Sequence, residues 1–200
     1  MKTILLGITG ASGMIYAKGF LELAKNSGIA VEAVVTKVGE LVLRHEKCEN
    51  ILKLCKKVYA IDDFFAPPAS GNSAFAGKGE GEGNGGRLSN ADKALRNEGG
   101  YIGMVVLPCS MGTLGRIAAG TSDNLLVRAA DVSLKENRTL VLVPREMPLN
   151  EIHLENMLKL KRAGAVILPA SPHFYNEPKT IEDLADTVAD RVLSIFSKNF

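Results

Sequence analysis

Short apolar runs rich in β-branched residues alternate along this chain with segments whose apolar residues recur at helical spacing. Thr3 to Ile8 is the first run, and it is followed by a glycine turn and a helical pattern. Further runs, each ahead of a segment that can form a helix, lie at 29–35, 102–107, 140–143 and 165–168. Continuous apolar strands that alternate with helices predict a mostly parallel sheet covered by helices on both faces.

Doubly wound α/β folds of this kind, Rossmann- or flavodoxin-like, bind their ligands at the carboxyl ends of the strands. We therefore expect the functional residues directly after the apolar runs. The chain has 200 residues, of which 46% are hydrophobic, and this is enough for a single domain over 1–200 with a sizeable core.

Charge and composition exclude several classes of function. The formal net charge is only +2, so no global basic field predicts binding to nucleic acid or to an anionic membrane surface. No stretch approaches the ~20 apolar residues that a membrane span needs, so we expect no membrane insertion. The three cysteines show neither a CxxC nor a Cys/His metal spacing, which argues against disulfides and zinc and favours the cytoplasm.

One segment departs from the strand and helix pattern. Six of the ten residues from 77 to 86 are glycine, and the sequence stays polar to about 97. Such a composition buries too little apolar surface to offset its ordering entropy, so we expect a flexible insert at about 74–100. A plain surface loop and a lid over an active site both remain open.

Two glycine-containing loops follow predicted strands. Gly10, Ala11, Ser12 and Gly13 come after the first run, where glycine lets the backbone approach a ligand and a helix N-terminus offers N–H groups to an anion. The spacing does not match the GxGxxG fingerprint, so a nucleotide or phosphate site and a simple tight turn are both possible.

The second loop, 108–113, follows the run at 102–107 and places the hydroxyls of Ser110 and Thr113 near a helix start. Ser110 can be a helix N-cap whatever else it does. Cys109 in this loop can be a reactive thiol beside a helix N-terminus or a buried structural cysteine. Two such loops at neighbouring strand ends favour a cofactor cleft over two unrelated turns.

Charged and aromatic side chains supply the remaining candidates. Arg145 and Glu146 directly follow the run at 140–143, where a guanidinium and a carboxylate could bind an anion and move a proton. Arg128 and Lys135 lie seven residues apart on one helix face, where cations are often merely solvated. The three scattered histidines do not support a nucleophilic triad. Tyr175, in a further strand-end loop, can pack against neighbours or donate to a phosphate oxygen.

Four segments of the chain form one ordered set: ITGASG at 8–13, APPASG at 66–71, a block from 108 (PCSMGTLGRIAAGTSDN) to 175 (PASPHFY), and IEDLADTVADRV at 181–192. Together they resemble the UbiX family of flavin prenyltransferases, once described as aromatic-acid decarboxylases. The insert at about 74–100 is the main departure from that family.

The resemblance implies an enzyme that takes reduced FMN as its substrate and joins to it the five-carbon group of dimethylallyl phosphate. The product, prenylated FMN, would serve a UbiD-type decarboxylase. No metal is implied. Family members look like large symmetric homo-oligomers, typically dodecamers.

The resemblance also assigns roles to residues. The positions that would hold FMN are Gly10, Ala11, Ser12, Thr36, Ser110, Met111, Gly112, Thr113 and Arg145. The positions that would grip the prenyl phosphate, with contributions from neighbouring subunits, are Arg128, Lys135, Tyr175 and Arg191. The positions implied in catalysis are Glu146, as a proton shuttle, Ser12, Lys135 and Glu46.

Two other functions are compatible with the glycine loops. A flavin-dependent cysteine decarboxylase would carry a Pro-x-Met-Asn signature and an active histidine, whereas this chain has Arg145 and Glu146 in the corresponding region. A non-catalytic flavin-binding subunit of a decarboxylase would not need the set of Arg128, Lys135, Glu146 and Tyr175. That set favours an enzyme.

Overall fold

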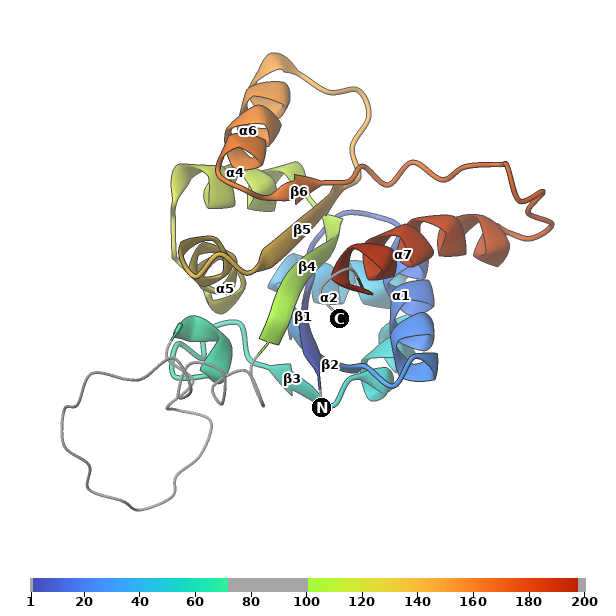
Figure 1. The fold of residues 1–200 in the computed structure, drawn as a ribbon, viewed down its shortest axis with the longest axis horizontal. Helices are drawn as coiled ribbons and strands as arrows, with labels where there is room; N and C mark the ends of the chain where they lie inside the picture. The colour runs from blue at the N-terminus through green and yellow to red at the C-terminus, as the bar shows by residue number, and fades with distance from the viewer. Residues whose placement is uncertain (1, 72–100, 198–200) are drawn as a thin grey trace.

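The computed structural model describes residues 2–71 and 101–197 (Figure 1). Six strands in these ranges form one sheet in the order β3-β2-β1-β4-β5-β6, and every neighbouring pair is parallel. Strands β2 and β3 extend the sheet on one side of β1, and β4, β5 and β6 extend it on the other. The expected doubly wound, Rossmann-like fold is confirmed, with the topological switch point between β1 and β4. The glycine-rich insert expected at 74–100 lies outside the described residues.

The apolar runs correspond closely to the strands. These are β1 (Thr3–Ile8), β2 (Ala30–Val35), β4 (Tyr101–Cys109), β5 (Thr139–Pro144) and β6 (Val166–Ile167). The edge strand β3 (Lys57–Tyr59) was not predicted. It has only three residues, two of them exposed, so it lacks the continuous apolar run that marks a central strand.

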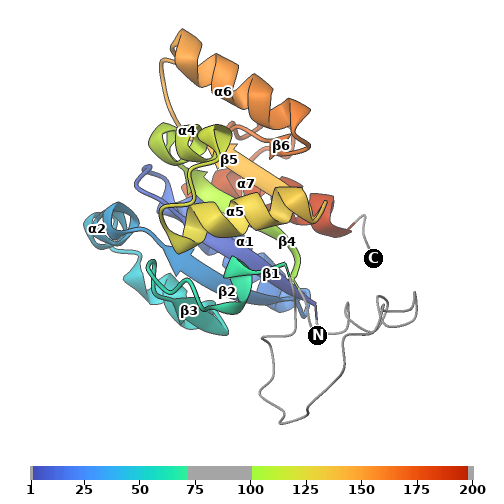
Figure 2. The same cartoon turned by 90° about the vertical axis from the view of Figure 1, so that its left-hand side faces the viewer.

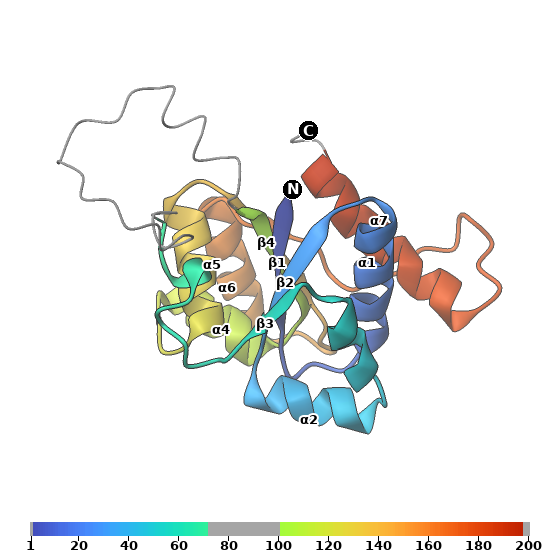
Figure 3. The same ribbon diagram turned by 90° about the horizontal axis from the view of Figure 1, so that it is seen from below.

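Helices cover both faces of the sheet, as Figures 2 and 3 show. On one face lie α1 (Met14–Asn26) and α7 (Ile181–Ser197), which pack against each other. On the other lie α4 (Met111–Ala119) and α5 (Leu125–Lys135), with α6 (Glu151–Arg162) packed against α4. The remaining helical segments are α2 (Lys37–His45) and the short 3₁₀ helices η1 (Glu49–Leu54) and η2 (Pro67–Ala69).

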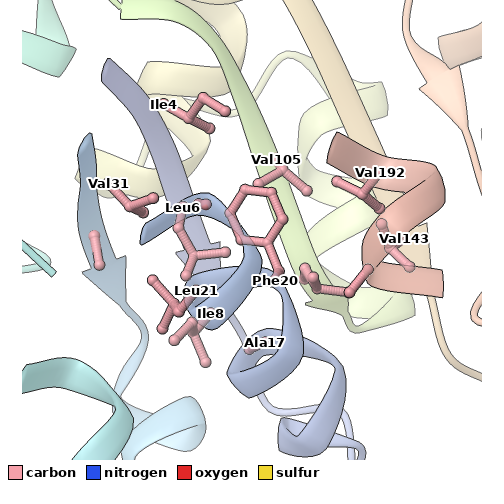
Figure 4. Close-up of a cluster of buried hydrophobic side chains, with 14 of the residues drawn as sticks. Ile4, Leu6, Ile8, Ala17, Phe20, Leu21, Val31, Val105, Val143 and Val192 are labelled. Carbon is pink, nitrogen blue, oxygen red and sulfur yellow. The ribbon is translucent and has the colours of Figure 1, made fainter. Parts of the chain in front are cut away.

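Each face of the sheet has its own hydrophobic cluster. All six residues of β1 are buried, and alternate side chains point to opposite faces. Figure 4 shows Leu6 and Val105 beside Phe20 of α1, and Ile8 beside Leu21. Phe20 is fully buried, so replacing it by alanine would cost ~3–5 kcal/mol. None of the helices in 2–71 and 101–197 has the length and apolar content of a membrane span.

A buried carboxylate ties three strands of the sheet together. Glu32 of β2 accepts a hydrogen bond of 2.7 Å from the Tyr59 hydroxyl on β3 and another from the Tyr101 hydroxyl on β4. Burial, with the hydrogen bonds to Glu32 adding to it, raises the pKa of Tyr101 far above its usual range and that of Tyr59 to about 12.

These raised tyrosine pKa values predict a loss of stability at alkaline pH. Above pH 10, the ordinary value, phenols of the unfolded chain lose protons that the folded chain retains. The stabilisation is therefore complete below pH ~10 and declines as pH rises further. Urea unfolding at pH 7, 9 and 11 should show this decline, and Tyr101→Phe should lessen it while losing ~1–3 kcal/mol at pH 7.

Tyr16→Phe is the control, because it removes a phenol of α1 that makes no contact with Glu32. It should keep the alkaline slope of the unmodified protein. Equal slopes for Tyr101→Phe and the unmodified protein would contradict the role of the cluster.

Candidate functional site

A cavity of about 600 Å³ opens at the carboxyl ends of the strands. Gly10 follows β1, Thr36 follows β2 and Ser110 follows β4, so all three come from the strand ends where ligands were expected. The other lining residues are Lys37, Val38, Ile61, Asp62, Thr113, Arg116, Asp123 and Asn124. The volume lies within the ~300–1,000 Å³ typical of small-molecule sites.

The hydroxyls at the strand ends have a structural role as well as a place on the cavity wall. Thr36 caps α2 by accepting from the Gly39 N–H at 3.0 Å, and Ser110 caps α4 by accepting from the Thr113 N–H at 3.3 Å. The Ser110 and Thr113 side-chain oxygens lie 3.1 Å apart. Ser110 is therefore both a helix N-cap and a cavity residue, because the capping hydrogen bond fixes its hydroxyl at the cavity wall.

A buried threonine joins the two strand ends at the switch point. The Thr9 hydroxyl donates to the Pro108 carbonyl oxygen at 2.7 Å and accepts from the Ser110 N–H at 2.7 Å. Because Thr9 is fully buried, these bonds hold the loop after β1 against the loop after β4.

Glycine is required at position 10 by close packing. A Cβ there would lie 2.4 Å from Cγ1 of Val38 on α2, closer than any real contact. The loop after β1 can therefore approach α2 only because residue 10 has no side chain. Ala11, beside it, is buried.

An internal carboxylate already occupies the N-terminus of α1. Glu46 accepts from the Gly13 N–H at 3.0 Å and from the Met14 N–H at 2.7 Å. Burial alone would raise the pKa of Glu46, but hydrogen bonds from the Ser12 side chain and these two N–H groups outweigh it, aided by the charge of Arg145. The pKa of Glu46 is thus lowered, and these N–H groups bind a protein carboxylate instead of a ligand phosphate.

Arg145 completes a cluster with Ser12 and Glu46. Its Nε donates to the Ser12 carbonyl oxygen at 3.1 Å, which places the guanidinium at the glycine loop. The three residues come from the β1–α1 loop, the end of α2 and the end of β5, and the fold brings them together. The next residue, Glu146, is exposed, and its Oε1 accepts from the Met147 N–H at 3.1 Å.

Two residues of the 108–113 loop contribute to packing instead of to an open surface. Cys109 is fully buried, and burial raises its pKa to about 12, so it is a structural cysteine and not an activated thiol. Met111 is buried in the cluster beneath α4. A Cβ at Gly112, in the first turn of α4, would make only an ordinary contact of 3.9 Å with Nη1 of Arg116.

The four residues expected around a prenyl phosphate do not meet within one chain. Arg128 and Lys135 lie on α5, whereas Arg191 lies on α7, on the other face of the sheet (Figure 3). Tyr175 is 92% exposed in the segment before α7, with its ring centroid 5.6 Å from that of His173. The sheet therefore separates the α5 pair from the α7 cation.

The α5 pair also has contacts of its own. Arg128 donates from Nε to the Ala69 carbonyl oxygen at 3.1 Å and pairs through Nη1 with Asp131 at 3.1 Å. Lys135 pairs with Glu136 at 2.7 Å. In the described part of the chain no cluster of three or more His, Cys, Asp or Glu side chains could hold a metal ion.

Several cavity residues were missed by sequence reasoning. Lys37 directly follows the expected Thr36 and could have been found by extending the strand-end rule by one residue. Ile61 and Asp62 follow β3, which had no recognisable strand pattern. Arg116 and Asp123 form an ion pair of 3.3 Å across the turn between α4 and α5, which depends on the tertiary structure.

Comparisons with known proteins agree on one family. A family model described as Flavoprotein matches residues 1–193. The flavin prenyltransferase UbiX of Methanocaldococcus jannaschii is 42% identical over 96% of this chain and 91% of its own length. That of Halalkalibacterium halodurans is 45% identical over 94% of this chain and 85% of its own length.

Solved structures give the same result. AnUbiX (PadA1) in complex with FMN and dimethylallyl pyrophosphate superimposes with a TM-score of 0.82 at 37% identity, over 98% of this chain and 92% of that chain. A dodecameric FMN-dependent UbiX-like decarboxylase from Escherichia coli O157:H7 has a TM-score of 0.79 at 36% identity, covering 98% and 94% of the two chains. The epidermin biosynthesis protein EpiD from Staphylococcus aureus, at 21% identity over 90% of each chain and a TM-score of 0.55, shares the fold alone.

The lowered pKa of Glu46 predicts how acid affects the protein. Its stabilising contribution is present above pH 4.5, the ordinary value, and is lost as pH falls through the lower folded-state pKa. Glu46→Gln should flatten the stability loss below pH 4.5 and cost ~1 kcal/mol at pH 7, because Gly13 and Met14 lose a charged acceptor. Chemical unfolding between pH 3 and 7 measures both effects.

Glu49→Gln is a matched control for this prediction. Glu49 is an exposed carboxylate three residues further on, and it does not contact the α1 N-terminus. If Glu46→Gln and Glu49→Gln showed the same acid profile, Glu46 would not be the responsible group.

Proposed function

Because this chain belongs to the UbiX flavin prenyltransferases of the Flavoprotein family, we propose that it joins the dimethylallyl group of dimethylallyl phosphate to reduced FMN. One observation carries the proposal. The cluster of Ser12, Glu46 and Arg145 lies at the strand-end edge that also opens the cavity, in a chain that matches named flavin prenyltransferases over nearly all its length.

The cavity fits a flavin mononucleotide. Glycine at position 10 leaves backbone accessible beside Val38, and the hydroxyls of Thr36, Ser110 and Thr113 can bond a polyol or a phosphate. Lys37 and Arg116 on the wall supply positive charge for the phosphate. We propose that Ala11, Met111 and Gly112 contribute backbone groups or packing to this site, and that Arg145 binds at its edge.

The reaction requires side chains that stabilise the departing phosphate and a side chain that accepts a proton. When the allylic carbon–oxygen bond breaks, phosphate departs with the bonding electron pair, so cations around it lower the barrier. Reduced FMN supplies the electron-rich ring that takes up the five-carbon unit. Closure of a further ring needs one proton added to the prenyl double bond and one removed from the flavin carbon that forms the new bond, and Glu146 is the exposed carboxylate next to Arg145 that can accept the latter. Ser12, fixed by Glu46, can hold a proton nearby.

We propose that the prenyl-phosphate site forms between copies of the chain. Arg128 and Lys135 cannot reach Arg191 through the sheet, but the α5 face of one copy can meet the α7 face of another. Large apolar side chains exposed on α6, in the segment before α7 and at the start of α7 support such contacts, namely Ile152, Leu154, Leu158, Phe174 and Ile181. The dodecameric relative is consistent with this arrangement.

The cellular context is also a proposal. By family resemblance, the prenylated FMN would pass to a UbiD-type decarboxylase as its cofactor. The three cysteines are free, which supports a cytoplasmic location.

The activity can be tested by incubating the protein anaerobically with reduced FMN and dimethylallyl phosphate. Mass spectrometry should detect a flavin heavier by one prenyl group. Glu146→Gln should retain FMN binding, measured by flavin fluorescence, but turn over ~10²-fold more slowly because the base is lost. Bound FMN without any adduct would rule out the transferase function, and an unimpaired Glu146→Gln would place the base elsewhere.

If two copies of the chain share each prenyl-phosphate site, two impaired variants should restore activity when they assemble together. Arg128→Ala and Arg191→Ala should each lose ~10²-fold in rate, because each removes a cation from the phosphate. Assemblies formed from an equal mixture of the two variants should recover activity at about one quarter of the sites, where each copy supplies its intact arginine. Prenyl transfer by co-assembled subunits measures the recovery.

The matched control mixes Arg128→Ala with Lys135→Ala. Both residues lie on α5 of the same copy, so no mixed site contains both intact residues and no recovery is expected. Equal recovery in the two mixtures, or none in either, would contradict a site divided between the α5 and α7 faces.

A further inference from the structure

A second hollow of about 440 Å³ lies toward the amino ends of the strands, away from the flavin cavity. It is bounded by the end of α1 and the turn into β2 on one side, and by the segment from η1 into β3 on the other (Figure 3). We call it the basic groove; its lining residues are Leu21, Lys25, Gly28, Ile29, Ala30, Val31, Lys53, Leu54, Cys55 and Lys56.

The floor of the basic groove is apolar. Leu21, Ile29 and Val31 expose less than a tenth of their surface and belong to the core beneath α1. Leu54 forms part of the opposite wall, and beside it burial raises the pKa of the Cys55 thiol to about 11, so that this thiol stays neutral. A ligand here would meet aliphatic surface and not a nucleophile.

The backbone of the groove offers few free polar groups. The Ile29 N–H donates to the Ala24 carbonyl oxygen at 2.9 Å, and the Ala30 N–H donates to that of Lys2 at 3.1 Å. The Val31 carbonyl oxygen accepts from the Lys56 N–H at 2.7 Å. With these peptide groups occupied, polar recognition must come mainly from side chains.

The charged side chains of the groove are three lysines. Lys56 lies 3.6 Å from Oε1 of Glu32, whose other oxygen accepts from two tyrosines. In the ranges that the structure describes, no ion pair joins Lys25 or Lys53 to a carboxylate. Lys25 lies in the last turn of α1 and Lys53 in the last turn of η1, where the helix dipole favours a cation.

We propose that the basic groove binds a small organic anion with an apolar body, an alkyl phosphate or an alkyl carboxylate, independently of the flavin cavity. The apolar body of the ligand would lie on the floor of Leu21, Ile29 and Val31, and its anionic group would lie between Lys25 and Lys53. Charge complementarity and the apolar floor together select this class, because a purely polar anion gains nothing from the floor and a neutral lipid gains nothing from the ammonium groups.

The binding can be measured by a local reporter. The chain contains no tryptophan, so Leu54→Trp introduces a single indole into the groove wall. Titration of the assembled protein with decyl phosphate and with decanoate should change its fluorescence in a saturable way. Calorimetry on the unmodified protein should give the same affinity. The tighter of the two probes identifies the preferred head group.

Removing two lysines tests the charge requirement. Lys25→Ala with Lys53→Ala leaves the Lys56–Glu32 pair intact and should weaken binding about tenfold. Lys159→Ala with Lys161→Ala removes the same charge from exposed positions of α6 and should change nothing. Lys25 and Lys53 do not line the flavin cavity and are not among the residues proposed to bind the prenyl phosphate. Weaker binding after their removal would therefore place the ligand in the basic groove.

Other results would overturn the proposal. Decanol binding as tightly as decyl phosphate, with no effect of the lysine changes, would show a plain apolar hollow. No saturable binding of either probe to the assembled protein would show that a second copy covers the groove or that it takes no ligand.

Discussion

The parallel pairing of β1 with a neighbour on each side is the constraint on which the rest of the structure depends. All six residues of β1 are buried, so the strand can only lie at the centre of the sheet. Parallel neighbours then bring the loops after β1, β2, β4 and β5 to the same edge. The flavin cavity and the Ser12, Glu46 and Arg145 cluster both occupy this edge.

Two polar side chains turn these separate loops into one site. Thr9 joins the ends of β1 and β4 through bonds of 2.7 Å, and Glu46 binds the first turn of α1 from the end of α2. Glu46 takes the N–H groups of Gly13 and Met14 that a phosphate would otherwise use. A bound phosphate would therefore depend on the hydroxyls and cations of the cavity wall.

The prenyl-phosphate site that we propose depends on more than one copy of the chain. The sheet that supports the flavin cavity also separates α5 from α7, so one copy cannot bring Arg128 and Arg191 together. Assembly of copies would supply both the missing cations and a cover for the apolar side chains near α6. Catalysis and oligomerisation would then depend on the same surfaces.

The sequence by itself determined every strand except β3, the sheet type and the strand-end positions of Gly10, Thr36, Ser110 and Arg145, because burial and chain direction leave a local pattern. The tertiary structure alone decided the rest. Glu46 meets Gly13 across 33 residues, and β3 is too short to leave a pattern. Such contacts and the separation of α5 from α7 arise from packing between distant segments, which no local periodicity records.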